Sequence, residues 1–295
     1  MYGNAARDSE DGDRLWSVVA CPDCYGAMIA AEGKVHCGRC ARPFPIGWNG
    51  VPILLARESR YCSNEARISC WTPRNSPARD MVKWRSRYWF PRTTPYDLTR
   101  RHREAVIASA GANGVVLNLG SGRQRPLNSR HIHLDVCPHP NCTVVADAQF
   151  LPFAAETIDA VLCENVFEML HPFLAAAELR RVVKPGGLVF VSTAFVLPKC
   201  HDDEAFRYSA TGLRRVFHDW DVVAAGSAAG PFRAFARLAE LAVEHILPGR
   251  TLRFIARWIV AWGMHPWKYL DPWILRRDDG EKAGTSCFVV VRKVT

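Results

Sequence analysis

The stretch VLNLGSGRQRP, residues 116–126, decides the fold class of this chain. An apolar run ends at Gly120, and Gly122 follows two positions later. Glycines at the carboxyl end of a buried parallel strand let the backbone turn sharply and approach a ligand closely. The third glycine of a dinucleotide-binding loop is absent, and Arg-Gln-Arg-Pro stands in its place. The stretch therefore predicts a strand followed by a ligand-binding loop that departs from the dinucleotide pattern.

Segments with strand character alternate with segments with helix character from residue 104 onward. Residues 172–183 predict an amphipathic helix, which ends at the KPGG of residues 184–187. We expect its turns to be marked by Phe173, Leu174, Ala177 and Arg181. The expected buried strands are 114–120, 131–136, 143–148, 158–166, 188–193 and a last one at 285–294. This alternation predicts an α/β fold with a doubly wound, Rossmann-like sheet.

Two aspartates stand where expected strands end. Asp135 closes the second strand, where a carboxylate can accept both hydroxyl groups of a ribose. Asp147 and Ala148 close the third strand and are placed to meet the edge of an adenine ring. Because the carboxyl ends of parallel strands share one edge of a sheet, these residues and the glycine loop predict one binding site.

Four segments carry a family resemblance: VVLNLGSG, LDV, VVADAQFLPFAAETIDAVLCENVFEML and ELRRVVKPGGLVFVSTAF. Over about residues 105–225 the chain resembles class I S-adenosylmethionine-dependent methyltransferases of the type 11 kind. The resemblance implies S-adenosylmethionine as the cofactor. This cofactor has no phosphate, so neither a third glycine nor a long following helix is required. The implied contacts are Asn118, Gly120, Ser121 and Gly122 at the methionine part, Asp135 at the ribose, Asp147 and Ala148 at the adenine, and Glu164 or Asn165 in the pocket wall.

A cysteine cluster precedes this region. Cys21, Cys24, Cys37 and Cys40 have the spacing C-x2-C-x12-C-x2-C, which suits the closed tetrahedral shell of structural Zn²⁺. The RPFPIGWNGVPILL that follows resembles the tail of short zinc-ribbon proteins that partner methyltransferases. We expect residues 1–56 to form a zinc ribbon that needs its metal to fold. The other cysteines show no paired spacing, which favours reduced thiols.

The net charge of +9 is concentrated in residues 57–103, which hold 12 basic and 4 acidic side chains. Arginines alternate with aromatic residues in its KWRSRYWFPR segment. Three interpretations of this basic aromatic linker remain open. It contacts RNA through phosphates and bases, it wraps the main domain as a strap, or it meets an anionic substrate or membrane surface.

The acceptor side of the site is expected after residue 193. His201 is the candidate general base, because an imidazole with a pKa of about 6.5 suits deprotonation of a hydroxyl group. Asp202, Asp203 and Glu204 are alternatives. We expect Arg207 and Tyr208 to line the acceptor site, in a segment whose Arg207 matches the pattern of the same methyltransferases.

Residues 231–275 predict two amphipathic helices rich in Trp and Arg, placed as a helical insertion or lid in the domain of residues 104–295. A peripheral membrane contact is the alternative. The longest uncharged stretch of this region is too short for a transmembrane segment, which takes about 20 apolar residues. The polar start of the chain does not resemble a secretory signal, so a cytoplasmic protein is expected.

Taken together, the sequence predicts an S-adenosylmethionine-dependent methyltransferase that acts on the oxygen of a small-molecule or saccharide acceptor. One alternative is an RNA base methyltransferase of the ribosomal guanine type, with the ribbon and the linker as RNA-binding parts. A second alternative is a non-catalytic module that binds nucleic acid.

Overall fold

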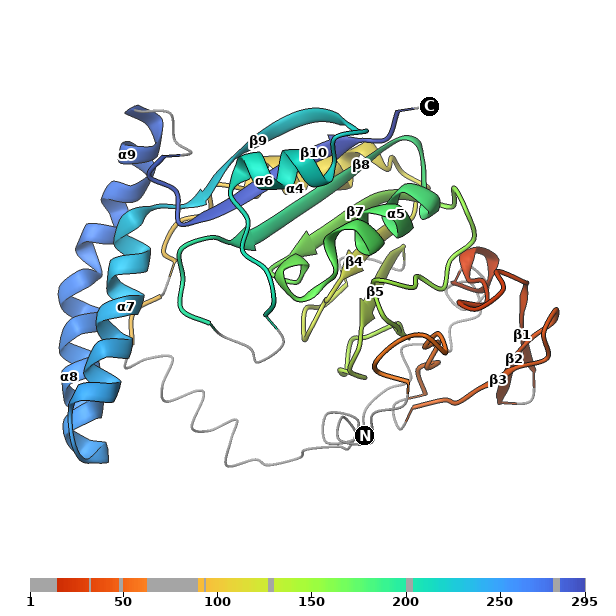
Figure 1. Ribbon diagram of the computed structural model, residues 1–295, viewed down its shortest axis with the longest axis horizontal. Coiled ribbons are helices and arrows are strands. Elements are labelled where there is room, and N and C mark those ends of the chain that lie inside the picture. Colours follow the sequence, from red (N-terminus) through yellow and green to blue (C-terminus); the bar gives the residue numbers. More distant parts are fainter. Residues whose placement is uncertain are drawn as a thin grey trace.

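A seven-stranded sheet forms the centre of the computed structural model, which describes residues 15–31, 33–47, 50–62, 90–92, 94–126, 130–199, 204–277 and 282–294 (Figure 1). The strand order is β6-β5-β4-β7-β8-β10-β9. Neighbours from β6 to β8 are parallel, and β10 is antiparallel to β8 and β9. The bounds are β4 Val116–Leu119, β5 His131–Asp135, β6 Val144–Val145, β7 Ile158–Glu164, β8 Val183–Ala194, β9 Asp221–Ala229 and β10 Ser286–Arg292. The expected α/β, doubly wound sheet is confirmed.

The order in which successive strands are added to the sheet reverses at β4. It runs outward from β4 to β5 and β6, and then returns to form β7 on the other side of β4. In open parallel sheets, ligands bind in the crevice that such a reversal opens at the carboxyl ends of the strands. The fold therefore predicts a ligand-binding site at the loops that follow β4 and β7.

Helices cover both faces of the sheet. The helix α4, Arg100–Ser109, packs through Val106 with Val116 of β4 on one face. The helices α5, Pro172–Val182, and α6, Ala210–Val216, share the opposite core with Leu117 of β4. Between β4 and β5, residues 120–126 and 130 contain no helix, in keeping with the expectation of a short one.

The buried face of α5 and the place of the KPGG segment after it differ from what the sequence indicated. Phe173 and Leu174 are 62% and 46% exposed, and the buried face of α5 consists of smaller side chains: Ala175, Ala176, Leu179 and Val182. Alanines allow the helix to lie close to the sheet, which the larger residues would prevent. The KPGG of residues 184–187 belongs to β8, which starts at Val183 directly after the helix.

The N-terminal region forms a small antiparallel sheet of β1, Met28–Ala31, β2, Lys34–Cys37, and β3, Pro43–Phe44. It contacts the rest of the chain through two isolated bridges. Val19 bridges Phe153, and Ile53 forms a parallel bridge with Val145 of β6. The backbone N–H of Leu54 donates to the carbonyl oxygen of Val145 at 2.8 Å, so this tail extends the large sheet beyond β6.

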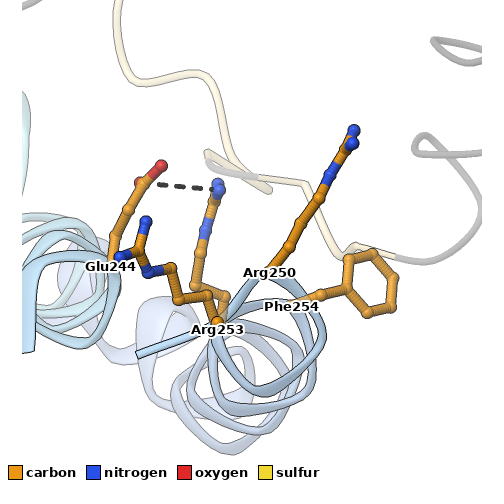
Figure 2. A pocket seen from close by; sticks show the side chains of 6 residues that line it. Glu244, Arg250, Arg253 and Phe254 are labelled. Carbon is orange, nitrogen blue, oxygen red and sulfur yellow. Dashed lines mark ion pairs between the residues drawn. The ribbon is translucent and has the colours of Figure 1, made fainter. Parts of the chain in front are cut away.

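Residues 231–277 form a helical hairpin followed by two short turns of helix (Figure 1). The bounds are α7 Pro231–Ile246, α8 Arg250–Met264, η3 Pro266–Leu270 and α9 Asp271–Arg277. Near the turn that joins α7 and α8, Glu244 of α7 and Arg250 and Arg253 of α8 line a pocket (Figure 2). Because β9 runs parallel to β8, α7 starts at the carboxyl edge of the sheet. Among the described residues, no helix has the length and apolar character needed to cross a bilayer.

Candidate active site and metal centre

The loop after β4 depends on its glycines for two different reasons. Gly120 and Gly122 have φ angles of +62° and +56°, which L residues with side chains rarely adopt. A Cβ atom on Gly120 would lie 2.1 Å from Cγ2 of Val166, in the segment that follows β7. A Cβ atom on Gly122 would meet no atom within 4 Å. Gly120 thus permits close packing of the two loops, and Gly122 borders open space.

Asp135, the last residue of β5, holds this loop in place. Its carboxylate accepts hydrogen bonds from the backbone N–H of Gly122 at 2.8 Å and of Cys137 at 3.0 Å. A carboxylate with two further lone pairs can still accept the hydroxyl groups of a ribose. Cys137 itself forms a disulfide, so the expectation of reduced thiols throughout is wrong at this position.

Two further polar groups of the loop region are buried. Asn118 is 4% exposed and donates from Nδ2 to Oε1 of Gln124 at 3.0 Å. The Ser121 hydroxyl group is 1% exposed and has no hydrogen-bond partner among the described residues. A buried hydroxyl group without a partner costs free energy unless a ligand or water satisfies it. The loop therefore has an unused donor next to the open space at Gly122.

Asp147 and Ala148 lie directly after β6, as expected, but the side chain of Asp147 has no exposed surface. One carboxylate oxygen accepts the hydroxyl group of Ser59 at 2.7 Å, and the other accepts the backbone N–H of Gln149 at 3.0 Å. Ser59 belongs to the tail of the N-terminal region. This tail closes the base of the expected adenine site, and the contact of Asp147 with adenine stays a prediction.

Glu164 ends β7 and faces α4. Its Oε2 lies 3.2 Å from Nη1 of Arg103, and Arg103 also pairs with Asp97 at 2.6 Å. Burial raises the pKa of Glu164, and the Arg103 guanidinium opposes this shift. Figure 1 places α4 and β7 in the same part of the molecule. The pair joins the helix to the strand end at the point where the sheet reverses.

A polar pocket of about 440 Å³ lies beside this pair, on the face of the sheet that α4 covers in part. Asn118, His131 and His133 line it from β4 and β5. His133 is 2% exposed, burial lowers its pKa, and its Nδ1 has no partner in the described chain. Sequence reasoning missed both histidines, although their spacing of two along a strand was a signal that they share one face.

The acceptor-side residues separate in the structure. Arg207 is exposed and pairs with Glu204, whereas Tyr208 is 7% exposed and packs between the rings of the buried Phe167 and the exposed Phe206. His201 lies outside the described residues. The structure adds Glu168, which is 4% exposed, accepts the hydroxyl group of Thr193 at 2.8 Å, and has a pKa raised by burial. No motif around Glu168 distinguished it from a core position.

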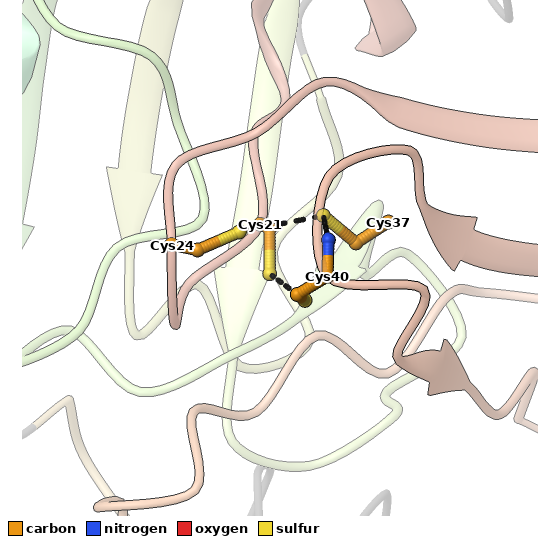
Figure 3. A group of neighbouring side chains, drawn as sticks. All are labelled: Cys21, Cys24, Cys37 and Cys40. Atoms are coloured by element: carbon orange, nitrogen blue, oxygen red, sulfur yellow. Dashed lines mark hydrogen bonds between the residues drawn. The ribbon is translucent and has the colours of Figure 1, made fainter.

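The four N-terminal cysteines converge (Figure 3). Their Sγ atoms all lie within 4.8 Å of one another, with 3.8 Å between Cys21 and Cys40 and 3.4 Å between Cys24 and Cys37. Tetrahedral Zn²⁺ with Zn–S bonds of about 2.3 Å places its ligands about 3.8 Å apart, so the cluster fits this ion. The backbone N–H groups of Arg39 and Cys40 donate to Sγ of Cys37, at 3.3 and 3.4 Å. Although burial opposes it, these donors lower the pKa of Cys37 to about 7.

Comparison with known proteins agrees with the fold. Residues 120–191 match the family model described as "Methyltransferase domain". The match spans the glycine loop, the ends of β5 to β7 and most of β8. Together with the strand order, the match supports a class I methyltransferase domain in this part of the chain, and that family implies S-adenosylmethionine as the methyl donor.

Individual relatives are distant. The chain is 26% identical over 237 residues to "Uncharacterized methyltransferase At1g78140, chloroplastic" of Arabidopsis thaliana, and the match covers 64% of each protein. The chain thus spans less than two thirds of that relative's length. Among solved structures it resembles phosphoethanolamine N-methyltransferase 2 of Haemonchus contortus, at 12% identity, 86% and 62% coverage and a TM-score of 0.43. It also resembles geranyl diphosphate C-methyltransferase of Streptomyces coelicolor, at 11% identity, 67% and 81% coverage and a TM-score of 0.39.

Proposed function

We propose that the protein transfers the methyl group of S-adenosylmethionine to an oxygen atom of a small-molecule or saccharide acceptor. The observation that carries the transferase part is the meeting of Gly120, Gly122, Asp135 and Glu164 at the carboxyl edge, where the sheet reverses at β4. Three features suit an adenosyl ligand: the open space at Gly122, the Ser121 hydroxyl group, which has no partner among the described residues, and the strand-end carboxylate of Asp135.

The residues of the chain have separate tasks in this proposal. Asp135 binds the ribose hydroxyl groups, and the Gly120–Gly122 backbone surrounds the methionine part. The bound cofactor supplies a methyl group already activated by the sulfonium. What remains for the protein is alignment of the acceptor oxygen with the methyl carbon, which contributes much of the acceleration in such displacements.

A hydroxyl acceptor also loses a proton. His201 is the sequence candidate for its removal, and the buried carboxylate of Glu168, which follows β7, is a second candidate. Burial disfavours the charged form of Glu168 and raises its affinity for a proton, which is the property a general base needs. Arg207 lies at the surface of this region and is placed to contact an acceptor.

The first test is binding of S-adenosylmethionine to the full chain, measured by calorimetry beside Asp135→Ala. We expect saturable binding by the wild type and at least a tenfold loss of affinity in the variant, because hydrogen bonds donated to a charged group are worth about 1.5–3 kcal/mol. Asp221→Ala is the matched control, since Asp221 is an exposed aspartate at the start of β9, on the opposite edge of the sheet.

The outcomes separate the function classes. Binding that Asp135→Ala loses and Asp221→Ala keeps supports the assigned pocket, and saccharide, phenolic and RNA acceptors can then be screened for methyl transfer. Absence of binding by a folded, zinc-loaded protein would overturn the proposal and favour a non-catalytic module. Methylation of RNA alone would replace the small-molecule acceptor by the RNA alternative.

For the cysteine cluster we propose a structural Zn²⁺. Four thiolates leave no open position for substrate or water, so the ion would stabilise the N-terminal region and take no part in methyl transfer.

A further inference from the structure

The hairpin of α7 and α8 keeps an apolar face exposed. On α8, the side chains of Leu252, Ile255 and Ile259 are 47%, 48% and 58% exposed. Their spacing of three and four residues places them on one side of the helix. Trp258, at 40% exposed, extends this side by one position. An amphipathic helix normally turns such a stripe toward a core, and here the described chain leaves it accessible.

The neighbouring helix continues the same feature. On α7, Phe235, Leu238 and Ile246 are 58%, 44% and 76% exposed and again follow helical spacing. Trp267 and Trp273, in η3 and α9, are each 53% exposed. The helices contact one another, as Figure 1 shows for α7 and α8. We call the α8 side that carries Leu252, Ile255, Trp258 and Ile259 the apolar face of the hairpin, and the exposed residues of α7, η3 and α9 add further apolar surface to the same substructure. So many exposed large apolar side chains on one substructure indicate an interaction site.

The charge of the region is strongly positive. Residues 231–277 contain eight Arg and Lys side chains and three Asp and Glu side chains. The acidic groups are engaged within the region: Glu240 pairs with Arg237, Glu244 pairs with Arg257, and Asp271 is buried. The surface charge that remains for a partner is therefore basic, and a second copy of this face would be repelled by it.

Arginines gather at the tip of the hairpin. A pocket of about 450 Å³ is lined by Glu244, Gly249, Arg250, Arg253, Phe254 and Arg257 (Figure 2). Arg250 extends away from Glu244, whose carboxylate faces Arg257. Arg253 donates from Nε to the carbonyl oxygen of Leu247 at 2.7 Å, which leaves its other nitrogens available. Three guanidinium groups and one carboxylate favour an anionic group such as a phosphate.

Exposed tryptophan and aliphatic side chains beside arginines are the composition of helices that lie in a membrane interface. There the apolar side chains enter the acyl boundary, and the arginines contact headgroup phosphates. A nucleic acid would use the arginines and aromatic rings, but it would leave Leu252, Ile255, Ile259 and Ile246 exposed to water.

We propose that the hairpin of α7 and α8 docks on the surface of an anionic phospholipid bilayer. The apolar face enters the interface, and Arg250 and Arg253 in the first turn of α8 supply positive charge that attracts the anionic headgroups. Because α7 starts at the carboxyl edge of the sheet, the hairpin extends from the same edge that carries the candidate active site. This inference does not depend on the proposed acceptor.

The test is co-sedimentation of the full chain with vesicles of phosphatidylcholine alone and of phosphatidylcholine with phosphatidylglycerol at 7:3. We expect binding to the anionic vesicles, weak binding to the neutral ones, and release by high salt, because the electrostatic part is screened. Ile255→Ser/Ile259→Ser should weaken binding to anionic vesicles by about tenfold or more, since both residues lose apolar area in the interface. Phe173→Ser is the control, because Phe173 is equally exposed but lies on α5.

The charge arm uses Arg250→Gln/Arg253→Gln, for which we expect a roughly 30-fold loss on anionic vesicles and little change on neutral ones. Arg215→Gln/Arg292→Gln removes two exposed arginines elsewhere and should leave binding unchanged. Circular dichroism verifies that each variant is folded. The proposal would be overturned if the wild-type protein did not bind anionic vesicles. It would also be overturned if the Ile255/Ile259 and Arg250/Arg253 variants bound them as strongly as their control variants do. A dimer abolished by the Ile255/Ile259 pair, without vesicle binding, would instead show a protein interface.

Discussion

At the scale of single residues, the glycine loop illustrates what a sequence reveals locally. The sequence predicted that the loop needs glycine at positions 120 and 122 because its backbone turns sharply, and both residues have positive φ angles. The sequence did not distinguish them, because the atom that excludes a Cβ at Gly120 belongs to Val166, far away in the chain. The alternation of Arg207 and Tyr208 between surface and core is a similar case, since neither residue type specifies its environment.

Gly120→Ala should destabilise the protein more than Gly122→Ala. Both substitutions place a Cβ atom at a left-handed backbone position, which costs about 1–2 kcal/mol. Gly120→Ala adds a clash with Val166, and overpacking of this kind costs a further 1–3 kcal/mol or so. Unfolding in urea measures both free energies, and Gly120→Ala/Val166→Ala should recover part of the difference. Equal losses for the two single variants would contradict the packing argument.

At the scale of elements, periodicity predicted the existence of α5 but not its orientation. Both sides of this helix carry apolar residues, so the choice between Phe173 and Ala175 as the buried side rests on how closely the helix approaches the sheet. The hairpin presents the opposite case. The helical periodicity of the hairpin was evident from the sequence. The exposure of the apolar stripe of α8 was not, because it depends on the fact that no described element packs on this stripe.

The start of α7 depends on a residue from α9. Asp271 is fully buried and accepts hydrogen bonds from the backbone N–H of Phe232 at 2.9 Å and of Arg233 at 3.2 Å, and from the hydroxyl group of Tyr96 at 2.5 Å. A carboxylate at this place accepts hydrogen bonds from free N–H groups of the first helical turn. Its negative charge also interacts favourably with the positive end of the helix dipole. Gly230 is needed beside it, because a Cβ atom there would lie 2.5 Å from Cγ of Asp271.

Asp271→Ala should therefore loosen the hairpin. Loss of a buried, charged hydrogen-bond acceptor leaves these donors unsatisfied, at a cost of about 1–3 kcal/mol. Hydrogen exchange should become faster at the amides of α7, with little change in the strands β4 and β7. Asp219→Ala is the comparison, since Asp219 forms an exposed ion pair with Arg180, worth at most about 1 kcal/mol. If the two variants behave alike, the anchoring role of Asp271 is wrong.

At the scale of the whole molecule, the N-terminal region and the methyltransferase domain share one core. Leu15, Val18 and Leu54 belong to the same buried cluster as Leu117 and Leu134 of the large sheet. Cys21 and Cys37 are members of it as well. The proposed metal ligands are thus continuous with the main core, and loss of the proposed ion should destabilise more than the N-terminal region.

Removal of zinc by a chelator should lower the melting temperature of a single, common transition by at least about 5 °C, because a small ribbon derives much of its folding free energy from its metal. Cys24→Ser should reproduce the effect without chelator. Cys62→Ser, which changes an exposed cysteine outside the cluster, should not. Calorimetry that resolves two transitions, with the larger one insensitive to chelation, would show that the parts unfold independently.

The sequence by itself determined the strands of the large sheet except β9, together with the glycine loop, the strand-end aspartate Asp135 and the cysteine cluster. These features follow from local backbone geometry, from periodicity and from the chemistry of closely spaced ligands. Only the tertiary structure decided that Ser59 seals Asp147, that Arg103 pairs with Glu164, and that α8 leaves its apolar face exposed. Ser59 and Asp147 are 88 positions apart, and burial at such distances depends on which surfaces pack together, a property that no single segment carries.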